Sequence, residues 1–236
     1  MNRPALLVLV RHAESLRNRE KGRNTYFPDD ESRKSVQGIP DHKIPLTELG
    51  VEQALKTGVG LKERFGTFDY VYHSGYERTM QTMNGILNAY MPEEISRMKI
   101  RMNHFIRERH AGYAYDMLEH EVDAAFPWLK EYWQTFGGFF ATPPGGESLE
   151  LFSSGIYLFL NMLFRDRAGE KVLVNTHGGT LRCFRFLLEH WNYDQAEKWP
   201  SGQSPKNCGL TVYKYDSAQG RLILQEYNTV YWEDSK

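Results

Sequence analysis

Apolar runs separated by polar stretches predict the strands of one sheet. The first run, Ala5 to Val10, has no polar interruption, which is typical of a strand buried on both faces of a parallel sheet. Three more strands are predicted at Phe68–Tyr72, residues 98–102 and Lys171–Asn175. The final apolar stretches, Leu210–Tyr215 and Arg221–Glu226, predict a hairpin that turns near Gly220.

Helical periodicity fills the intervals between these strands. Thr47 is the expected N-cap of a helix, and Leu46 and Val51 have the spacing of a hydrophobic staple. Two more helices are predicted at residues 77–90 and Thr180–His190. Strands that alternate with helices predict an α/β fold, a three-layer α/β/α sandwich around a mainly parallel sheet. The apolar stripe of the first helix is formed by Val51, Ala54, Leu55, Leu61 and Phe65.

Two segments depart from this alternation. Residues 14–45 are charged and contain three prolines and Gly38 as breakers, so we expect them to be irregular. Residues 104–147 are rich in aromatic side chains, most of which we expect in the core, and Ser148 is the expected N-cap of the next helix. We interpret 104–147 as a helical insertion, or cap, over the strand ends and the active site. Without repeats or linkers, residues 1–236 are predicted to form a single domain.

Composition and charge narrow the class of protein. A hydrophobic content of 41% and a charged content of 25% are ordinary for a soluble globular protein of 236 residues. The formal net charge of −1 gives no reason to expect a nucleic-acid or membrane partner. Cys183 and Cys208 are too few for a disulfide framework, and the run at residues 5–10 is shorter than a signal-peptide core, so we expect a cytoplasmic protein. Nothing in the sequence indicates an oligomeric state.

The first chemical signal directly follows the first predicted strand. The chain reads Arg11-His12-Ala13-Glu14-Ser15, and Asn18 lies three residues further on. Open α/β sheets bind ligands at the carboxyl ends of their strands. An Arg-His pair at that place predicts an anion site that contains a nucleophile. The alternative for a lone histidine is a residue that caps the strand and satisfies a loop hydrogen bond.

Three further motifs each follow a strand-like segment. They are Ser74-x-x-x-Arg78, Arg107-Glu108-Arg109 and Thr176-His177-Gly178-Gly179. In this order, the four motifs resemble those of the histidine phosphatase superfamily, which includes cofactor-dependent phosphoglycerate mutases and many phosphomonoesterases. The resemblance spans residues 11–179 and implies phosphoryl transfer through a phosphohistidine on His12.

Phosphoryl transfer requires positive charge and hydrogen-bond donors around the phosphate oxygens. Arg11 and Arg78 suit this task, because a guanidinium binds phosphate through two parallel hydrogen bonds and stays charged. His177 would add a ring donor, and the N–H groups around Gly178 begin a helix and favour an anion there. The remaining oxygens can accept hydrogen bonds from Ser15 and Asn18.

His12 must be neutral to attack phosphorus, with its other ring nitrogen held by a backbone carbonyl. An arginine-rich pocket favours this state by lowering the histidine pKa. Glu108 is the expected proton donor, because Glu108 to Gly112 resembles the family pattern Glu-Arg-x-x-Gly. The alternative is that Glu108 only pairs with Arg107 or Arg109.

Neither a metal ion nor another cofactor is expected. His12-x-Glu14 has the wrong spacing for a helical pair of metal ligands, and the surrounding arginines would repel a cation. The expected partner is therefore a small phosphorylated substrate alone.

Hydrolysis is favoured over mutase activity. Phosphoglycerate mutases carry two adjacent arginines after the Glu-Arg-x-x-Gly motif, whereas this chain has no arginine from Ala111 to Phe164. We expect a phosphomonoesterase, and the alternatives are a phosphoglycerate mutase-type phosphotransferase and a non-catalytic phosphate-ligand-binding protein.

Basic residues flank the predicted site. If residues 11–23 and 107–110 line its mouth, the positive rim would favour compact substrates with more than one anionic group. The alternative is a solvated basic loop. The basic residues concerned are Arg11, Arg17, Arg19, Lys21, Arg23, Arg107, Arg109 and His110.

Overall fold

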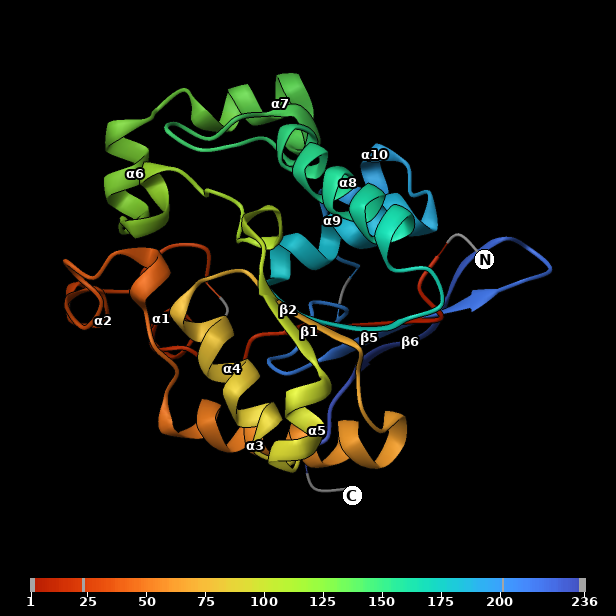
Figure 1. The fold of residues 1–236 in the computed structure, drawn as a ribbon. Coiled ribbons are helices and arrows are strands. Elements are labelled where there is room, and N and C mark those ends of the chain that lie inside the picture. Colours follow the sequence, from red (N-terminus) through yellow and green to blue (C-terminus); the bar gives the residue numbers. More distant parts are fainter. Residues whose placement is uncertain (1–2, 23, 201, 234–236) are drawn as a thin grey trace.

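A six-stranded mixed sheet runs through the centre of the described residues, which are 3–22, 24–200 and 202–233 of a computed structural model (Figure 1). Strands β3, β2, β4 and β1, which are neighbours in this order, run parallel. Strand β5 is antiparallel to β1 and forms the hairpin with β6. The predicted α/β fold with a mainly parallel sheet is confirmed. Across the sheet, the strands are β3 (Lys99–Met102), β2 (Tyr70–His73), β4 (Lys171–Thr176), β1 (Leu6–Arg11), β5 (Leu210–Asp216) and β6 (Arg221–Thr229).

Helices cover both faces of the sheet (Figure 1). Successive side chains of a strand point to opposite faces, so β1 sends Val8 and Val10 to one side and Leu7 and Leu9 to the other. Each fully buried side chain of this kind contributes about 1.5–3 kcal/mol. One face is covered by α3 (Glu48–Phe65), α4 (Glu77–Leu87) and α5 (Pro92–Arg97), and the other by α8 (Leu149–Asp166), α9 (Gly178–Glu189) and α10 (Tyr193–Glu197).

Helix α3 packs through small residues rather than through the whole predicted stripe. Thr47 is its N-cap, as expected, because its hydroxyl accepts a hydrogen bond from Gly50 N at 3.0 Å. Val51 and Leu55, however, are 46% and 36% exposed, so the predicted stripe is wrong at these two positions. A Cβ atom at Gly58 would lie 2.4 Å from the carbonyl oxygen of Ile86, which shows that α3 and α4 approach backbone to backbone.

Residues 14–45, here called the N-terminal excursion, are more ordered than expected. They form α1 (Leu16–Lys21), α2 (Asp30–Lys34) and the 3₁₀ helix η1 (Asp41–Lys43). Side chains of Ser15 and Asp29 cap α1 and α2, and such caps stabilise short helices that composition alone does not predict. Phe27, Val36 and Ile44 of the excursion form a small apolar cluster with Leu118, which belongs to residues 104–147.

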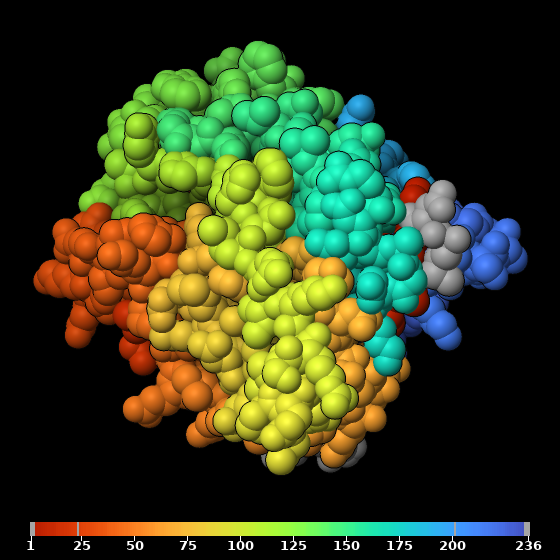
Figure 2. Space-filling model, viewed as in Figure 1, coloured from red at the N-terminus to blue at the C-terminus, as the bar shows by residue number. Residues whose placement is uncertain are grey.

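Residues 104–147, here called the aromatic segment, contain η2 (His104–Ile106), η3 (Tyr113–Asp116), α6 (Glu119–Ala125) and α7 (Leu129–Phe140). Figure 2 shows this green segment lying beside the orange N-terminal excursion, and Phe27 and Leu118 form a β-bridge between them. Phe139 is buried, but Trp128 and Phe136 are 50% and 56% exposed. Phe140 is exposed as well, and Tyr132 and Trp133 are only partly buried, against a small cluster of Ala114, Val122 and Leu129. The expectation that most of these aromatics are core is therefore wrong.

Both cysteines are buried free thiols, Cys183 on α9 and Cys208 in the turn before β5. Cys183 is on the buried face of α9, and Cys208 lies in a small cluster with Ala13 and Ala54. Burial raises the pKa of each thiol to about 12, so neither is a reactive thiolate. In the described ranges, no helix combines the length and the apolar character needed to cross a bilayer.

Candidate active site

The carboxyl ends of β1, β2 and β4 open onto a cavity of about 480 Å³. The parallel register places Arg11 beside Thr176, and the N–H of His12 donates to the carbonyl of Thr176 at 2.8 Å. Seven of the eight predicted site residues line this cavity, and the eighth, His177, is buried directly against His12 with ring centroids 5.2 Å apart. The seven are Arg11, His12, Ser15, Asn18, Arg78, Glu108 and Gly178.

His12 is held with one ring nitrogen committed. Its Nδ1 lies 2.7 Å from the carbonyl oxygen of Ala13, and because a carbonyl can only accept, Nδ1 carries the proton. The lone pair therefore resides on Nε2. Burial, together with the charges of Arg78 and Arg11, holds the pKa of His12 well below its ordinary value. The ring is neutral and suited to nucleophilic attack.

His177 follows β4 as His12 follows β1. Its Nε2 shares a hydrogen bond of 2.8 Å with the hydroxyl of Ser74, the first residue after β2. Its Nδ1 is buried and has no hydrogen-bond partner among the described residues. Burial and the charge of Arg78 hold the pKa of His177 well below its ordinary value. A buried nitrogen without a partner beside the nucleophile is a group that an incoming anion could satisfy.

The two predicted phosphate-binding arginines are anchored differently. Arg11 donates from Nη1 to the carbonyl of Pro205 at 2.5 Å, and its buried Nε has no partner in the described part of the chain. Arg78 donates to Asp41, from Nη1 to the backbone carbonyl at 2.6 Å and from Nη2 to Oδ2 at 3.2 Å. Asp41 lies on η1, lines the cavity and was not singled out from the sequence.

Two basic residues of the N-terminal excursion make buried internal contacts. Arg17 is buried and pairs with Asp116 of the aromatic segment and with Asp41. Lys21 is buried too, and its Nζ donates to the carbonyls of Thr25 and Tyr115. Arg17 lines the cavity together with Arg11, Arg109 and His110, so part of the predicted basic rim is present, but Arg17 and Lys21 also join two segments of the chain. Arg19 pairs with Glu20, and Arg23 lies outside the described residues.

Glu108 is held in the cavity by its backbone. The hydroxyls of Thr176 and Thr180 donate to the carbonyls of Ile106 and Arg107, which fixes the segment against β4 and α9. One carboxylate oxygen of Glu108 accepts a hydrogen bond from Arg109 N at 2.9 Å. Burial raises the pKa of Glu108, although Arg78 and Arg11 oppose the shift. A raised pKa favours the protonated carboxyl group, which is the form that a general acid requires.

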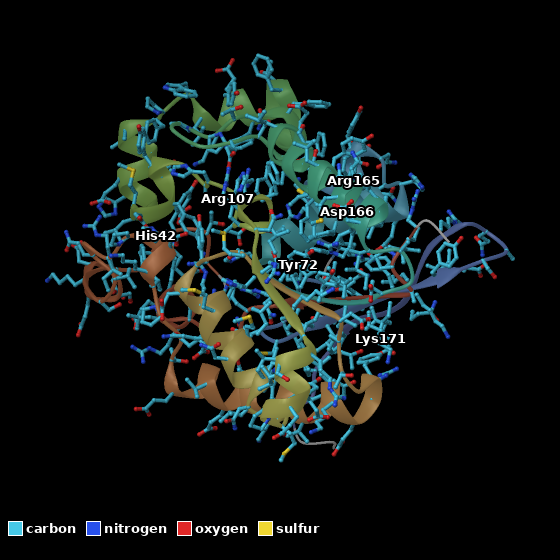
Figure 3. The ribbon with its side chains drawn as sticks, in the orientation of Figure 1. His42, Tyr72, Arg107, Arg165, Asp166 and Lys171 are labelled. Carbon is cyan, nitrogen blue, oxygen red and sulfur yellow. The ribbon has the colours of Figure 1, made fainter. Side chains whose placement is uncertain are left out.

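The alternative that Glu108 serves only as an ion-pair partner does not fit these contacts. Arg107, which Figure 3 labels, forms a two-bond ion pair with Glu147 at 2.7 and 2.8 Å. The guanidinium of Arg109 donates to the carbonyl of Glu147 at 3.1 Å. Gly179 leaves the space that the carboxylate uses, since a Cβ atom there would lie 2.5 Å from Glu108 Oε1.

Ser15 and Asn18 have partly structural roles. Ser15 caps α1, and its hydroxyl donates to Asn18 Oδ1 at 3.0 Å. Asn207 also donates from Nδ2 to this oxygen at 3.2 Å, and to the carbonyl of His12 at 3.0 Å. The backbone N–H of Asn18 donates to Ser15 Oγ at 3.3 Å, whereas its side-chain Nδ2 makes no hydrogen bond within the described ranges and, on a residue that lines the cavity, is a donor for a ligand. No sequence pattern marks Asn207, because its place depends on the loop that precedes β5.

Other cavity residues also come from segments far apart in the sequence. His42, labelled in Figure 3, follows Asp41 on η1, and Tyr76 lies between Ser74 and Arg78. The rings of Tyr76 and His177 are 5.0 Å apart. In the described residues, no group of three or more potential histidine, cysteine or carboxylate ligands is placed to hold a metal ion.

Comparison with known proteins places these motifs in one family. The family model of the histidine phosphatase superfamily (branch 1) matches residues 7–228. A 2,3-bisphosphoglycerate-dependent phosphoglycerate mutase of Sinorhizobium fredii is 32% identical over 195 residues, which are 80% of this chain and 82% of that protein. A phosphoglycerate mutase-like protein of Arabidopsis thaliana is 26% identical over 83% of this chain and 69% of its own length.

Solved structures share the fold. The alpha-ribazole phosphatase of Shigella flexneri superimposes with a TM-score of 0.72 at 19% identity, covering 95% of this chain and 96% of that one. A mycobacterial glucosyl-3-phosphoglycerate phosphatase, in complex with inorganic phosphate, gives a TM-score of 0.68 at 20% identity, covering 98% of this chain and 100% of that one.

Proposed function

The chain belongs to the histidine phosphatase superfamily (branch 1), and from this premise we propose that it is a phosphomonoesterase that hydrolyses a small phosphorylated metabolite through a phosphohistidine on His12. One observation carries the proposal. The hydrogen bond from His12 Nδ1 to Ala13 leaves Nε2 as the nucleophile in a cavity that also holds Arg11, Arg78 and Glu108.

In the first step, His12 Nε2 attacks phosphorus and the bond between phosphorus and the ester oxygen breaks. Glu108 gives its proton to the departing oxygen, so the alcohol leaves neutral and Glu108 becomes a carboxylate. The phosphorylated ring of His12 carries a positive charge, which the carbonyl of Ala13 stabilises through Nδ1–H. Arg11 and Arg78 bind the phosphoryl oxygens throughout.

In the second step, Glu108 takes a proton from water while the water oxygen attacks phosphorus. The bond between phosphorus and His12 Nε2 breaks, and the products are inorganic phosphate and the original states of His12 and Glu108. His177 lies beside the phosphoryl group, and a phosphate dianion both raises the pKa of this histidine and offers its unpaired nitrogen a partner. Because arginines supply the positive charge, no metal ion is required.

A mutase-type phosphotransferase is the second candidate, because relatives at about 30% identity are phosphoglycerate mutases. A mutase must bind the carboxylate of its substrate and keep water from the phosphohistidine. The chain has no arginine between Ala111 and Phe164 to bind that carboxylate, and Arg17 is already paired with Asp116. Both observations favour hydrolysis.

Two assays separate the candidates. The purified protein is incubated with p-nitrophenyl phosphate, and separately with 3-phosphoglycerate plus 2,3-bisphosphoglycerate. A phosphomonoesterase releases phosphate in the first assay without forming 2-phosphoglycerate at a comparable rate in the second. The opposite result identifies a mutase, and no turnover in either assay identifies a binding protein.

A further inference from the structure

A second cavity, of about 560 Å³, adjoins the first. Three residues line both cavities: Arg109, Leu149 and Arg182. From this shared boundary the second cavity extends to Trp133 and Gly138 on α7. The two cavities therefore meet at a boundary that carries two guanidinium groups.

The two arginines at the boundary differ from neighbouring arginines, which form ion pairs with glutamates. Arg107 pairs with Glu147, and Arg185 pairs with Glu189. In the part of the chain that the structure describes, Arg109 and Arg182 have no carboxylate partner; each donates only to a neutral backbone carbonyl, at 3.1 Å and 2.7 Å.

Arg182 also keeps an unused donor. Its buried Nε has no hydrogen-bond partner among the described residues. Burial lowers the pKa of Arg182, and the nearby charge of Arg109 lowers it further. The charge of Glu108 opposes this shift, but among the described residues neither arginine forms an ion pair with that carboxylate, and two like charges at one boundary are an arrangement that a bound anion stabilises.

This boundary lies on the leaving-group side of the reaction. Arg109 directly follows the proton donor Glu108, and a Cβ atom at Gly179 would touch both, at 2.5 Å from Glu108 Oε1 and 3.6 Å from Arg109 Cβ. Arg182 follows Gly178 by four residues on α9 and so shares its helical face. An alcohol protonated by Glu108 thus departs next to the two arginines.

The far part of the cavity has room for more than a small anion. Gly138 lets α7 approach α10 closely, since a Cβ atom there would lie 2.6 Å from Glu197 Cγ. The adjacent Gly137 adopts φ 72° and kinks α7 at this wall. Trp133 offers an aromatic surface for the organic part of a ligand.

On these observations, we propose that Arg109 and Arg182 form a second anion subsite, which binds a carboxylate or phosphate group carried by the leaving group of the substrate. The second cavity takes up the rest of that leaving group. This inference rests on the proposed phosphatase function and names its substrate class: phosphomonoesters of alcohols that bear a second negative charge.

The test compares binding of matched ligands by isothermal titration. One pair is 3-phosphoglycerate and glycerol 3-phosphate, which differ by one carboxylate; the other is fructose 1,6-bisphosphate and fructose 6-phosphate, which differ by one phosphate. We expect the wild type to bind the more anionic member of at least one pair about tenfold more tightly or better. The pair that shows the preference identifies the anion as carboxylate or phosphate.

Arg182→Gln should lower that ratio by about tenfold, and Arg182→Lys should retain part of it. Arg165→Gln is the control, because Arg165 is an exposed arginine on α8, away from both cavities (Figure 3), and it should keep the wild-type ratio. The subsite is overturned if the wild type shows no affinity preference in either pair. It is also overturned if a folded Arg182→Gln variant keeps the wild-type affinity ratio. Absence of p-nitrophenyl phosphate hydrolysis by a wild type that keeps the preference contradicts the phosphatase function instead.

Discussion

Asp41 lies against Arg78, with 3.2 Å between Asp41 Oδ2 and Arg78 Nη2, and the aspartate lines the cavity in which phosphate is proposed to bind. The same carboxylate is 3.4 Å from Arg17 Nε. An internal carboxylate thus neutralises part of the positive charge that a substrate phosphate would meet. It also orients Arg78, because the backbone carbonyl of Asp41 accepts a second hydrogen bond.

Replacing Asp41 by Asn should strengthen phosphate binding. The substitution removes one negative charge from the cavity and leaves the backbone contact with Arg78 in place. Since the Asp41 side chain is 42% exposed and therefore screened, we expect about 1 kcal/mol, or roughly a fivefold lower inhibition constant for inorganic phosphate. Glu31→Gln, on exposed α2, should leave that constant unchanged. Weaker inhibition in Asp41→Asn would show that orientation of Arg78 matters more than charge.

Glu108→Gln should slow alkyl phosphates much more than p-nitrophenyl phosphate. Glutamine cannot supply a proton, and p-nitrophenolate departs without one whereas an alkoxide does not. We expect kcat to fall by about 100-fold or more for glycerol phosphate, in line with general acid catalysis. Equal slowing of both ester classes would make Glu108 a binding or structural residue.

Stability should fall below neutral pH because His12 and His177 are buried and neutral. Their folded pKa values lie well below the ordinary 6.5, so below that pH the unfolded chain binds more protons. Each histidine lowers the free energy of unfolding by about 1.4 kcal/mol per pH unit until its folded pKa is reached. The raised pKa of Glu108 has the opposite effect: over its titration range it increases the free energy of unfolding as the pH falls.

Urea unfolding between about pH 7 and about pH 5.5 measures this slope. His177→Gln should have a shallower dependence than the wild type, since one of the two depressed pKa values is gone. His120→Gln, at an exposed position of α6, should keep the wild-type dependence. A His177→Gln slope equal to that of the wild type would mean that this histidine is not held neutral.

Removal of divalent metal ions should leave turnover intact. Arg11, Arg78 and the donors around His177 supply the charge and hydrogen bonds that a metal ion would otherwise provide. Dialysis against a chelator should therefore change kcat for p-nitrophenyl phosphate by no more than about twofold. A larger loss that added Mg²⁺ or Zn²⁺ restores would contradict this expectation.

Residues that directly follow a buried strand could be placed from the sequence. His12, Ser74 and His177 come after β1, β2 and β4, and parallel strands bring these positions to one edge. Glu108 was found through its motif, and two threonine contacts from β4 and α9 explain its position.

Side chains whose place depends on distant loops could not be predicted. Asp41 reaches Arg78 because the N-terminal excursion is fixed by contacts such as Phe27 with Leu118, 91 positions apart in the numbering. The pairing of Arg17 with Asp116 has the same origin, and it places a carboxylate beside one arginine of the predicted basic rim. Local propensity carries no information on such contacts.

Capture of the phosphorylated enzyme tests most directly whether His12 is the nucleophile. Wild type is mixed with a radiolabelled phosphate ester, quenched within the first turnovers, and treated with acid or with base. We expect a label that is stable in base and labile in acid, located on the peptide that contains His12, and absent from a folded His12→Ala variant that also lacks turnover. Substantial turnover by His12→Ala, or a label on another residue, would contradict it.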